Sequence, residues 1–201
     1  MGFSPRDTLG HTIIPMLQTI AVVELILCWI AWALAFVNAR KQAAGQKKVV
    51  RAPASWWGIA LVAVGFFLVM VNVRPLGFQK STLSLIASML LAPPSVALAW
   101  AATRHLGKQW RYEAALTEDH DLIQTGPYRL VRHPIYASML GMLLAAGTCL
   151  TWWPMFLAGL AFFLTGTEIR IHAEERLLAQ RFQTTYAAYR TRVPAYIPFL
   201  R

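Results

Sequence analysis

The chain has 201 residues, of which 57% are hydrophobic and 14% are charged, and its formal net charge is +10. This balance excludes an ordinary soluble domain and is typical of integral membrane proteins. Membrane proteins gather Lys and Arg in cytoplasmic loops and near anionic lipid, so we expect anionic lipid and no nucleic acid as a partner. Cys28 and Cys149 lie in apolar stretches, and no Cys/His pair has the spacing of metal ligands. We therefore predict core thiols, with neither a disulfide nor a metal site.

Three apolar stretches precede residue 104, and each is long enough for a transmembrane helix. They cover about Pro15–Val37, Ser55–Val73 and Thr82–Thr103. Glu24 lies inside the first of them, where a carboxyl group is costly, and we expect it to have a structural partner rather than a catalytic role. The loop at 38–52 carries five basic residues and no acid, which indicates the cytoplasmic side.

The densest cluster of reactive groups follows in Glu118–Tyr136, which reads EDHDLIQTGPYRLVRHPIY. It holds two histidines, two tyrosines, two arginines and three acids. Gly126, Pro127 and Pro134 predict a shaped loop that runs into a helix. Irregular backbone at membrane depth persists where it is buried in protein or lines a cavity, so we expect this loop to form a site.

The apolar stretch after this loop is too long for one span, and the residues Thr151 to Pro154 interrupt it. We predict a helical hairpin of two further spans, Ile135–Leu150 and Pro154–Ile169. The charged tail, His172–Arg201, has apolar and aromatic residues at helical spacing. We expect it to form an amphipathic helix that ends before Pro194 and whose aromatic stripe serves ordinary packing.

These elements predict one all-α membrane domain over residues 1–201, an integral helical bundle of about five transmembrane helices with a C-terminal amphipathic helix. Its N-terminal part, 1–103, would hold three spans, and its catalytic half, 104–201, would hold the loop, the hairpin and the tail helix. With the first loop inside, 16 of the 19 Lys and Arg residues lie in the cytoplasm. We therefore expect a multi-pass protein whose loop and tail meet on the cytoplasmic face.

Three segments of the C-terminal half resemble the isoprenylcysteine carboxyl methyltransferase family, whose wider relatives are the phospholipid methyltransferases. They read LGKQW at 106–110, HDLIQTGPYRLVRHPIY at 120–136 and RIHAEERLLAQRFQTTYAAYRTRVP at 170–194. The resemblance covers about half of the chain, and the combination of GPYxxxRHPxY with the last segment is specific. It implies a membrane enzyme that transfers a methyl group from S-adenosylmethionine to a lipophilic acceptor.

By motif position, the resemblance also implies which residues contact the cofactor. They are Glu113, His120, Leu122, Ile123, Tyr128, His133, Pro134, Ile135, Tyr136 and Glu174. Glu113 stands where eukaryotic members of the family have a glutamine. The resemblance further implies that Arg170 binds the acceptor carboxylate and that Arg170 and Glu174 form the catalytic pair.

The residue types agree with these roles. A sulfonium and an ammonium group need a carboxylate nearby, and a guanidinium can bind a carboxylate through two parallel hydrogen bonds. Plainer interpretations are a surface ion pair for Arg170 and Glu174, lipid-anchoring roles for Arg129 and Arg132, and a solvated helix face. That face would comprise His172, Glu175 and Arg176, with Glu175 as a possible support for Glu174.

Three other functions stay open at this point. A phospholipid amine or small-thiol acceptor would need a base or a neutral amine. An NADPH-dependent membrane reductase of the sterol type would need basic residues around its phosphates, for which Lys108, Arg129 and Arg132 are candidates. A non-catalytic scaffold would bind no cofactor and would tolerate changes at His133 and Glu174.

Overall fold

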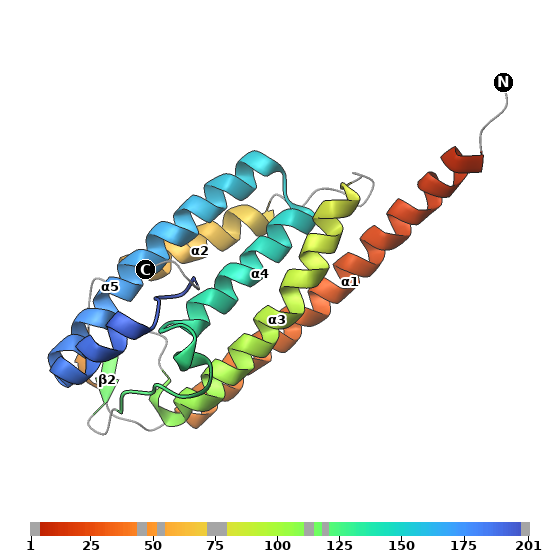
Figure 1. Cartoon of the computed structure of the whole chain (residues 1–201). Coiled ribbons are helices and arrows are strands. Elements are labelled where there is room, and N and C mark those ends of the chain that lie inside the picture. Colours follow the sequence, from red (N-terminus) through yellow and green to blue (C-terminus); the bar gives the residue numbers. More distant parts are fainter. Residues whose placement is uncertain are drawn as a thin grey trace.

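The computed structural model describes residues 5–43, 48–51, 55–71, 80–110, 115–117 and 121–197. Five long helices form a bundle (Figure 1), namely α1 (Pro5–Gln42), α2 (Ser55–Val71), α3 (Thr82–Leu106), α4 (Pro134–Leu150) and α5 (Trp153–Arg192). Two short 3-10 helices, η1 (Gly107–Gln109) and η2 (Gly126–Arg129), lie in the connections. Strands β1 (Lys48–Arg51) and β2 (Ala115–Thr117) pair antiparallel. The predicted helical membrane bundle is confirmed, and this small ribbon is the β structure among the described residues.

The helices differ in how clearly they qualify as membrane spans. Among the described residues, three segments are long and apolar enough to cross a membrane: Ile14–Gln42, Thr82–Gln109 and Trp153–Arg192. The apolar helices α2 and α4 have 17 residues each, which corresponds to about 26 Å of helix. That length is close to the roughly 30 Å of a bilayer's hydrocarbon core. The count of five spans stays a prediction.

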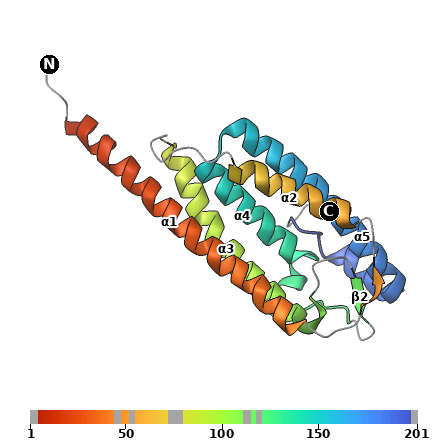
Figure 2. The same ribbon diagram turned by 180° about the vertical axis from the view of Figure 1, so that it is seen from behind.

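The bundle is built from pairs of neighbouring helices (Figures 1 and 2). Helix α1 runs along α3, α3 packs on α4, and α2 packs along α5. Both views show the N-terminal end of α1 projecting beyond the other helices.

Glycines bring α2 and α5 into close contact. A Cβ atom added to Gly65 of α2 would lie 2.6 Å from the carbonyl oxygen of Gly159 in α5. Two turns along the same helices, a Cβ at Gly58 would lie 2.7 Å from the carbonyl oxygen of Gly166. Small residues at such crossings let two backbones approach closely. The pair α2 and α5 therefore has almost no tolerance for added side-chain volume at these positions.

The expected division between a fifth span ending at Ile169 and a separate tail helix is wrong. Helix α5 continues from Trp153 to Arg192, and its break comes later, at Gln183, where φ is 39° and ψ is −111°. The charged residues near His172 mark the end of the apolar composition, but none of them is a Gly or Pro that would end the helix. After Gln183 the last turns fold back toward the bundle (Figure 1), and the helix ends before Pro194 as predicted.

Residues 193–197, which we call the C-terminal strap, run back past the start of α4. The backbone N–H groups of Arg132 and His133 donate to the carbonyl oxygens of Pro194 and Ala195, both over 2.8 Å. The hydroxyl of the buried Tyr196 donates a hydrogen bond to Glu168 Oε1 of α5, with 3.0 Å between the two oxygen atoms. The strap thus fixes the loop before α4 against α5.

The other end of the bundle is tied together by Thr151, which follows α4. Its Oγ1 donates to the carbonyl oxygen of Val69 at the end of α2 over 2.8 Å. Its own carbonyl oxygen accepts a hydrogen bond from the buried Lys80 Nζ, just before α3. These contacts join the ends of α2 and α4 to the start of α3.

We predict that Thr151→Val lowers the free energy of unfolding by about 1–2 kcal/mol, because it leaves the buried Val69 carbonyl without this donor. Heat denaturation in detergent measures the effect. Thr148→Val is the matched control, since Thr148 bonds within its own helix to Leu144 and Ala145. Equal losses in the two variants would contradict a tie between helices at Thr151.

Candidate functional site

A cavity of about 750 Å³ lies at the end of the bundle where the strap returns. This volume is within the usual range for small-molecule pockets, about 300–1,000 Å³. Side chains of α1, α2, α4 and α5 line it, together with the loop before α4. It has an apolar arm between helices and a polar end at the loop and α5.

Aromatic and aliphatic side chains of three helices form the apolar arm. They are Trp29, Trp32, Ala33 and Phe36 of α1, Ile59, Val62, Ala63, Phe66, Phe67 and Met70 of α2, and Met139 of α4. The rings of Trp29 and Phe66 meet edge to face with 5.6 Å between their centroids, so α1 and α2 contact each other here. These side chains give the part of the cavity between α1 and α2 an apolar lining.

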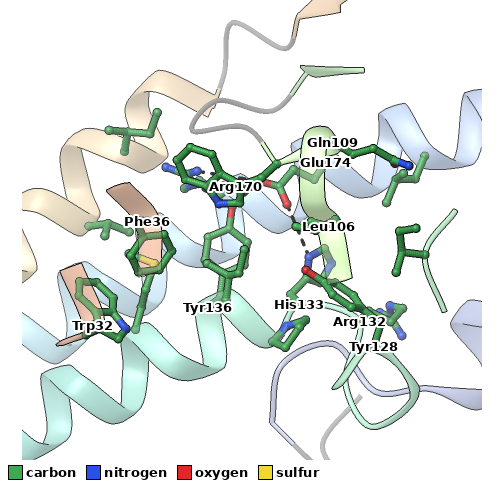
Figure 3. Close-up of a pocket in the computed structure, with 18 of the residues that line it drawn as sticks. Trp32, Phe36, Leu106, Gln109, Tyr128, Arg132, His133, Tyr136, Arg170 and Glu174 are labelled. Atoms are coloured by element: carbon green, nitrogen blue, oxygen red, sulfur yellow. Dashed lines mark hydrogen bonds and ion pairs between the residues drawn. The ribbon is translucent and has the colours of Figure 1, made fainter. Parts of the chain in front are cut away.

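Tyr136 links two charged side chains at the polar end. Its hydroxyl donates to Glu174 Oε1 and accepts from Arg170 Nε over 2.8 Å. The Arg170 Nη2 atom lies 4.0 Å from Glu174 Oε1. Figure 3 shows Tyr136 between the aromatic residues of α1 and His133, with its hydroxyl toward Arg170 and Glu174. Arg170 is 8% exposed, so the pair is not a solvent-exposed surface ion pair.

His133 lies between two carboxylates at the start of α4. Its Nδ1 is 3.5 Å from Glu174 Oε2, and its Nε2 is 3.3 Å from Glu175 Oε1. Burial alone would lower the pKa of this imidazole, but the hydrogen bonds and charges of the two carboxylates outweigh it and raise the pKa above its ordinary value. The protonated form is therefore favoured in the folded protein.

The Glu175 carboxylate contacts three basic side chains at the polar end, those of Arg132, His133 and Arg190. Its Oε1 accepts from Arg132 Nε over 3.0 Å and from Nη2 over 2.7 Å. Its Oε2 lies 3.5 Å from Arg190 Nε. Arg132 Nη1 also donates to the carbonyl oxygens of Arg190 and Val193, the latter in the strap. Two plainer interpretations are thus corrected, because Arg132 and Glu175 are buried in an ion pair instead of facing lipid headgroups or water.

The structure brings most of the predicted site residues to one cavity. The lining includes Leu122, Ile123, Tyr128, His133, Pro134, Ile135, Tyr136, Arg170 and Glu174. Glu113 and His120 lie outside the described residues. His172 and Arg176 are exposed, as expected for a solvated helix face.

The aromatic stripe of the tail was expected to serve ordinary packing, and two of its members are buried as expected but also take part in the site. Tyr186 and Tyr189 line the cavity, and the Tyr189 hydroxyl donates to the Tyr128 carbonyl oxygen over 2.6 Å. The break at Gln183 turns this stripe toward the loop, and a helical pattern continued through Gln183 cannot predict that turn. Burial raises the pKa of Tyr128 well above its ordinary value, with a further contribution from Glu174, so its phenol stays protonated.

Other lining residues were given no site role from the sequence, although Gln109 and Trp110 belong to the LGKQW segment that carries part of the resemblance. Gln109 and Trp110 reach the cavity from the connection after α3, and the Gln109 side-chain oxygen accepts from the Asp121 backbone over 3.2 Å. The aromatic residues of α1 and α2 looked like ordinary membrane-span composition. Hydropathy identifies such spans but does not say which face lines a cavity.

We predict that Glu175→Gln lowers the pKa of His133, because the variant removes one of the two carboxylate charges that favour imidazolium. The pKa of His133 is higher in the folded protein than in the unfolded chain, where it is about 6.5. The attraction between the His133 imidazolium and the two carboxylates therefore stabilises the fold fully below about pH 6.5, and this stabilisation is lost as the pH rises through the folded-state pKa. NMR titration of labelled histidine measures the shift. Glu168→Gln is the control, since Glu168 contacts His172 and Tyr196. An unchanged His133 titration in Glu175→Gln would contradict the assignment.

One comparison with known proteins covers this site. The model of the isoprenylcysteine carboxyl methyltransferase family matches residues 86–180. The match runs from α3 through the loop and α4 to the part of α5 that carries Arg170 and Glu174. A search of curated proteins finds no match. Over the matched segment, which is a little under half of the chain, the protein is similar to the isoprenylcysteine carboxyl methyltransferase family.

Proposed function

We propose that the protein transfers a methyl group from S-adenosylmethionine to the carboxylate of a lipophilic acceptor that resembles isoprenylcysteine. The observation that carries this proposal is the shape of the cavity. A polar end with Arg170 and Glu174 continues into an apolar arm between α1 and α2. Such a cavity suits a molecule with an anionic head and a long hydrocarbon chain.

The donor set at the polar end fits the cofactor. S-adenosylmethionine, when bound, supplies a methyl group activated by a sulfonium cation. The Glu174 side chain is 27% exposed, so its carboxylate remains accessible from the cavity to a cationic group. Phenol and imidazole groups of Tyr128, His133 and Tyr136 supply further polar contacts, and Leu122 and Ile123 supply apolar surface for a flat base. Pro134 and Ile135, with Glu113 and His120 by motif, would complete the binding set.

Arg170 is the proposed acceptor-binding residue. Its guanidinium carbon lies 5.3 Å from the centre of the Tyr136 ring. Met139 and the α1 aromatic residues of the apolar arm line the same cavity. Guanidinium recognises carboxylate through paired hydrogen bonds. An ionised carboxylate is already a nucleophile, so the protein's task is to orient it and to exclude water rather than to supply a base.

The bilayer is the proposed source of the acceptor, and the cytoplasm is the proposed side of the polar end. Trp56 and Trp57 are exposed at the polar end, and Trp152 and Trp153 are exposed at the opposite end, where interfacial aromatic residues are expected. Basic residues at the ends of α1 and α3 lie at the polar end, namely Arg40, Lys41 and Arg104. Their position supports a cytoplasmic orientation and contact with anionic lipid.

The residues that line the cavity fit NADPH-dependent reduction, or methylation of an amine or a thiol, less well than methylation of a carboxylate. An NADPH cofactor would need cations for its phosphates, yet Lys108 and Arg129 are not among the lining residues. Arg132 does line the cavity, but it is bound to Glu175 and to the carbonyl oxygens of Arg190 and Val193. An amine or thiol acceptor would need a base, and the Glu174 carboxylate already accepts a hydrogen bond from the Tyr136 hydroxyl and lies beside His133.

We predict that the purified protein binds S-adenosylhomocysteine and that Glu174→Gln weakens this binding at least roughly tenfold, because a charged hydrogen-bond partner is lost. Calorimetric titration in detergent measures both, with NADPH titrated in parallel. Glu168→Gln is the matched control on the same helix, outside the cavity. Binding of NADPH alone would replace the proposal with a reductase, and binding of neither compound to folded protein would support a scaffold.

A further inference from the structure

Gly58 lies in α2, outside the segment that matches the family, and faces the residue proposed to bind the acceptor. Gly58 is buried. A Cβ atom added there would lie 2.5 Å from Arg170 Cγ, 2.7 Å from the Gly166 carbonyl oxygen and 3.3 Å from the Arg170 nitrogen. Real Cβ atoms do not make contacts as short as the first two. The stem of Arg170 therefore occupies the space that any other residue at position 58 would fill.

The contact at Cγ matters because the χ1 angle alone sets the position of that atom. A helical residue has two favourable χ1 wells, so an obstacle at Cγ moves the whole side chain into another well. The guanidinium would then leave Tyr136, whose hydroxyl now accepts from Arg170 Nε over 2.8 Å. One methyl group added to Gly58 of α2 would therefore move the Arg170 guanidinium away from its place at the polar end of the cavity.

The second glycine crossing of the same two helices lacks this feature. A Cβ at Gly65 would lie 2.6 Å from the Gly159 carbonyl oxygen, 2.9 Å from the Phe163 nitrogen and 3.0 Å from Phe163 Cβ. The crowding of backbone against backbone is at least as close as at Gly58, but it involves no charged side chain. Neither glycine is itself a lining residue, but the side chain that Gly58 faces, Arg170, lines the cavity, whereas Phe163 does not.

We propose that Gly58 is a positioning residue for Arg170: the missing side chain in α2 sets the Arg170 rotamer that presents the guanidinium to the acceptor carboxylate. This inference rests on the proposed function, in which Arg170 binds that carboxylate. On this inference, α2 contributes to recognition of the acceptor carboxylate through Arg170, in addition to contacting the acceptor's hydrocarbon chain.

The test compares two ligands that differ by one charge, N-acetyl-S-farnesylcysteine and its methyl ester, by calorimetry with the full-length protein in detergent. The wild type is expected to bind the acid at least roughly tenfold more tightly than the ester, which is the scale of a hydrogen bond to a charged group. Gly58→Ala should reduce this ratio to about one to three, since the guanidinium is displaced. Gly65→Ala should keep the wild-type ratio within about twofold, because additivity holds for a site without shared partners.

Stability supplies a second measurement that needs no ligand. Gly58→Ala should lower the melting temperature more in the wild type than in Arg170→Ala, which has no Cγ atom to obstruct. Gly65→Ala should lower it equally in both backgrounds. A Gly58→Ala variant that folds only together with Arg170→Ala would support the contact in the same way.

The outcomes separate this inference from the function on which it rests. If Arg170→Ala loses the preference for the acid but Gly58→Ala keeps it or behaves as Gly65→Ala does, the role of Gly58 is overturned and the proposed function stands. Equal stability losses from Gly58→Ala in the two backgrounds would also overturn it. If the wild type does not prefer the acid, or Arg170→Ala retains the preference, the acceptor assignment fails and the role of Gly58 fails with it.

Discussion

The polar end of the cavity depends on one buried carboxylate, that of Glu175. It accepts hydrogen bonds from Arg132 in the loop and contacts His133 at the start of α4 and Arg190 near the end of α5. Removing charges from water is costly, and a buried pair is stable when its remaining donors and acceptors are also satisfied. Arg132 meets that condition because its Nη1 donates to the carbonyl oxygens of Arg190 in α5 and Val193 in the strap. The network therefore specifies one arrangement of loop, helix and strap, even where it adds little net stability.

This arrangement explains why the site residues need so many distant segments of the chain. His133 and Tyr136 are held by the strap and by α5, and Tyr136 in turn positions Arg170 and Glu174. Each of these side chains has a partner from another segment, so its rotamer is set before any ligand enters. Sites preorganised in this way lose less entropy when they bind.

The sequence predicts the apolar helices and the polar loop well, because hydropathy and proline spacing report on them directly, while the number of membrane spans stays a prediction. It also places nine of the described motif residues, from Leu122 to Glu174, at one cavity. It fails where the outcome depends on tertiary contacts. The break at Gln183 carries no Gly or Pro signal, and the burial of Glu175 depends on Arg132, which lies 43 residues away in the chain. The glycines of α2 and α5 are visible in the sequence, but nothing there says that Gly58 faces Arg170.

The cavity assigns different tasks to different parts of the chain. Its charged end lies within residues 86–180, which match the family, while most of the apolar arm comes from α1 and α2, which precede the match. Cofactor chemistry requires fixed polar groups at fixed positions, whereas a hydrocarbon chain requires only apolar volume of suitable length. The second requirement constrains the sequence less than the first. Under the proposed function, acceptor choice would therefore reside mainly in α1 and α2, and under the proposed role of Gly58 that N-terminal part would also constrain the charged end.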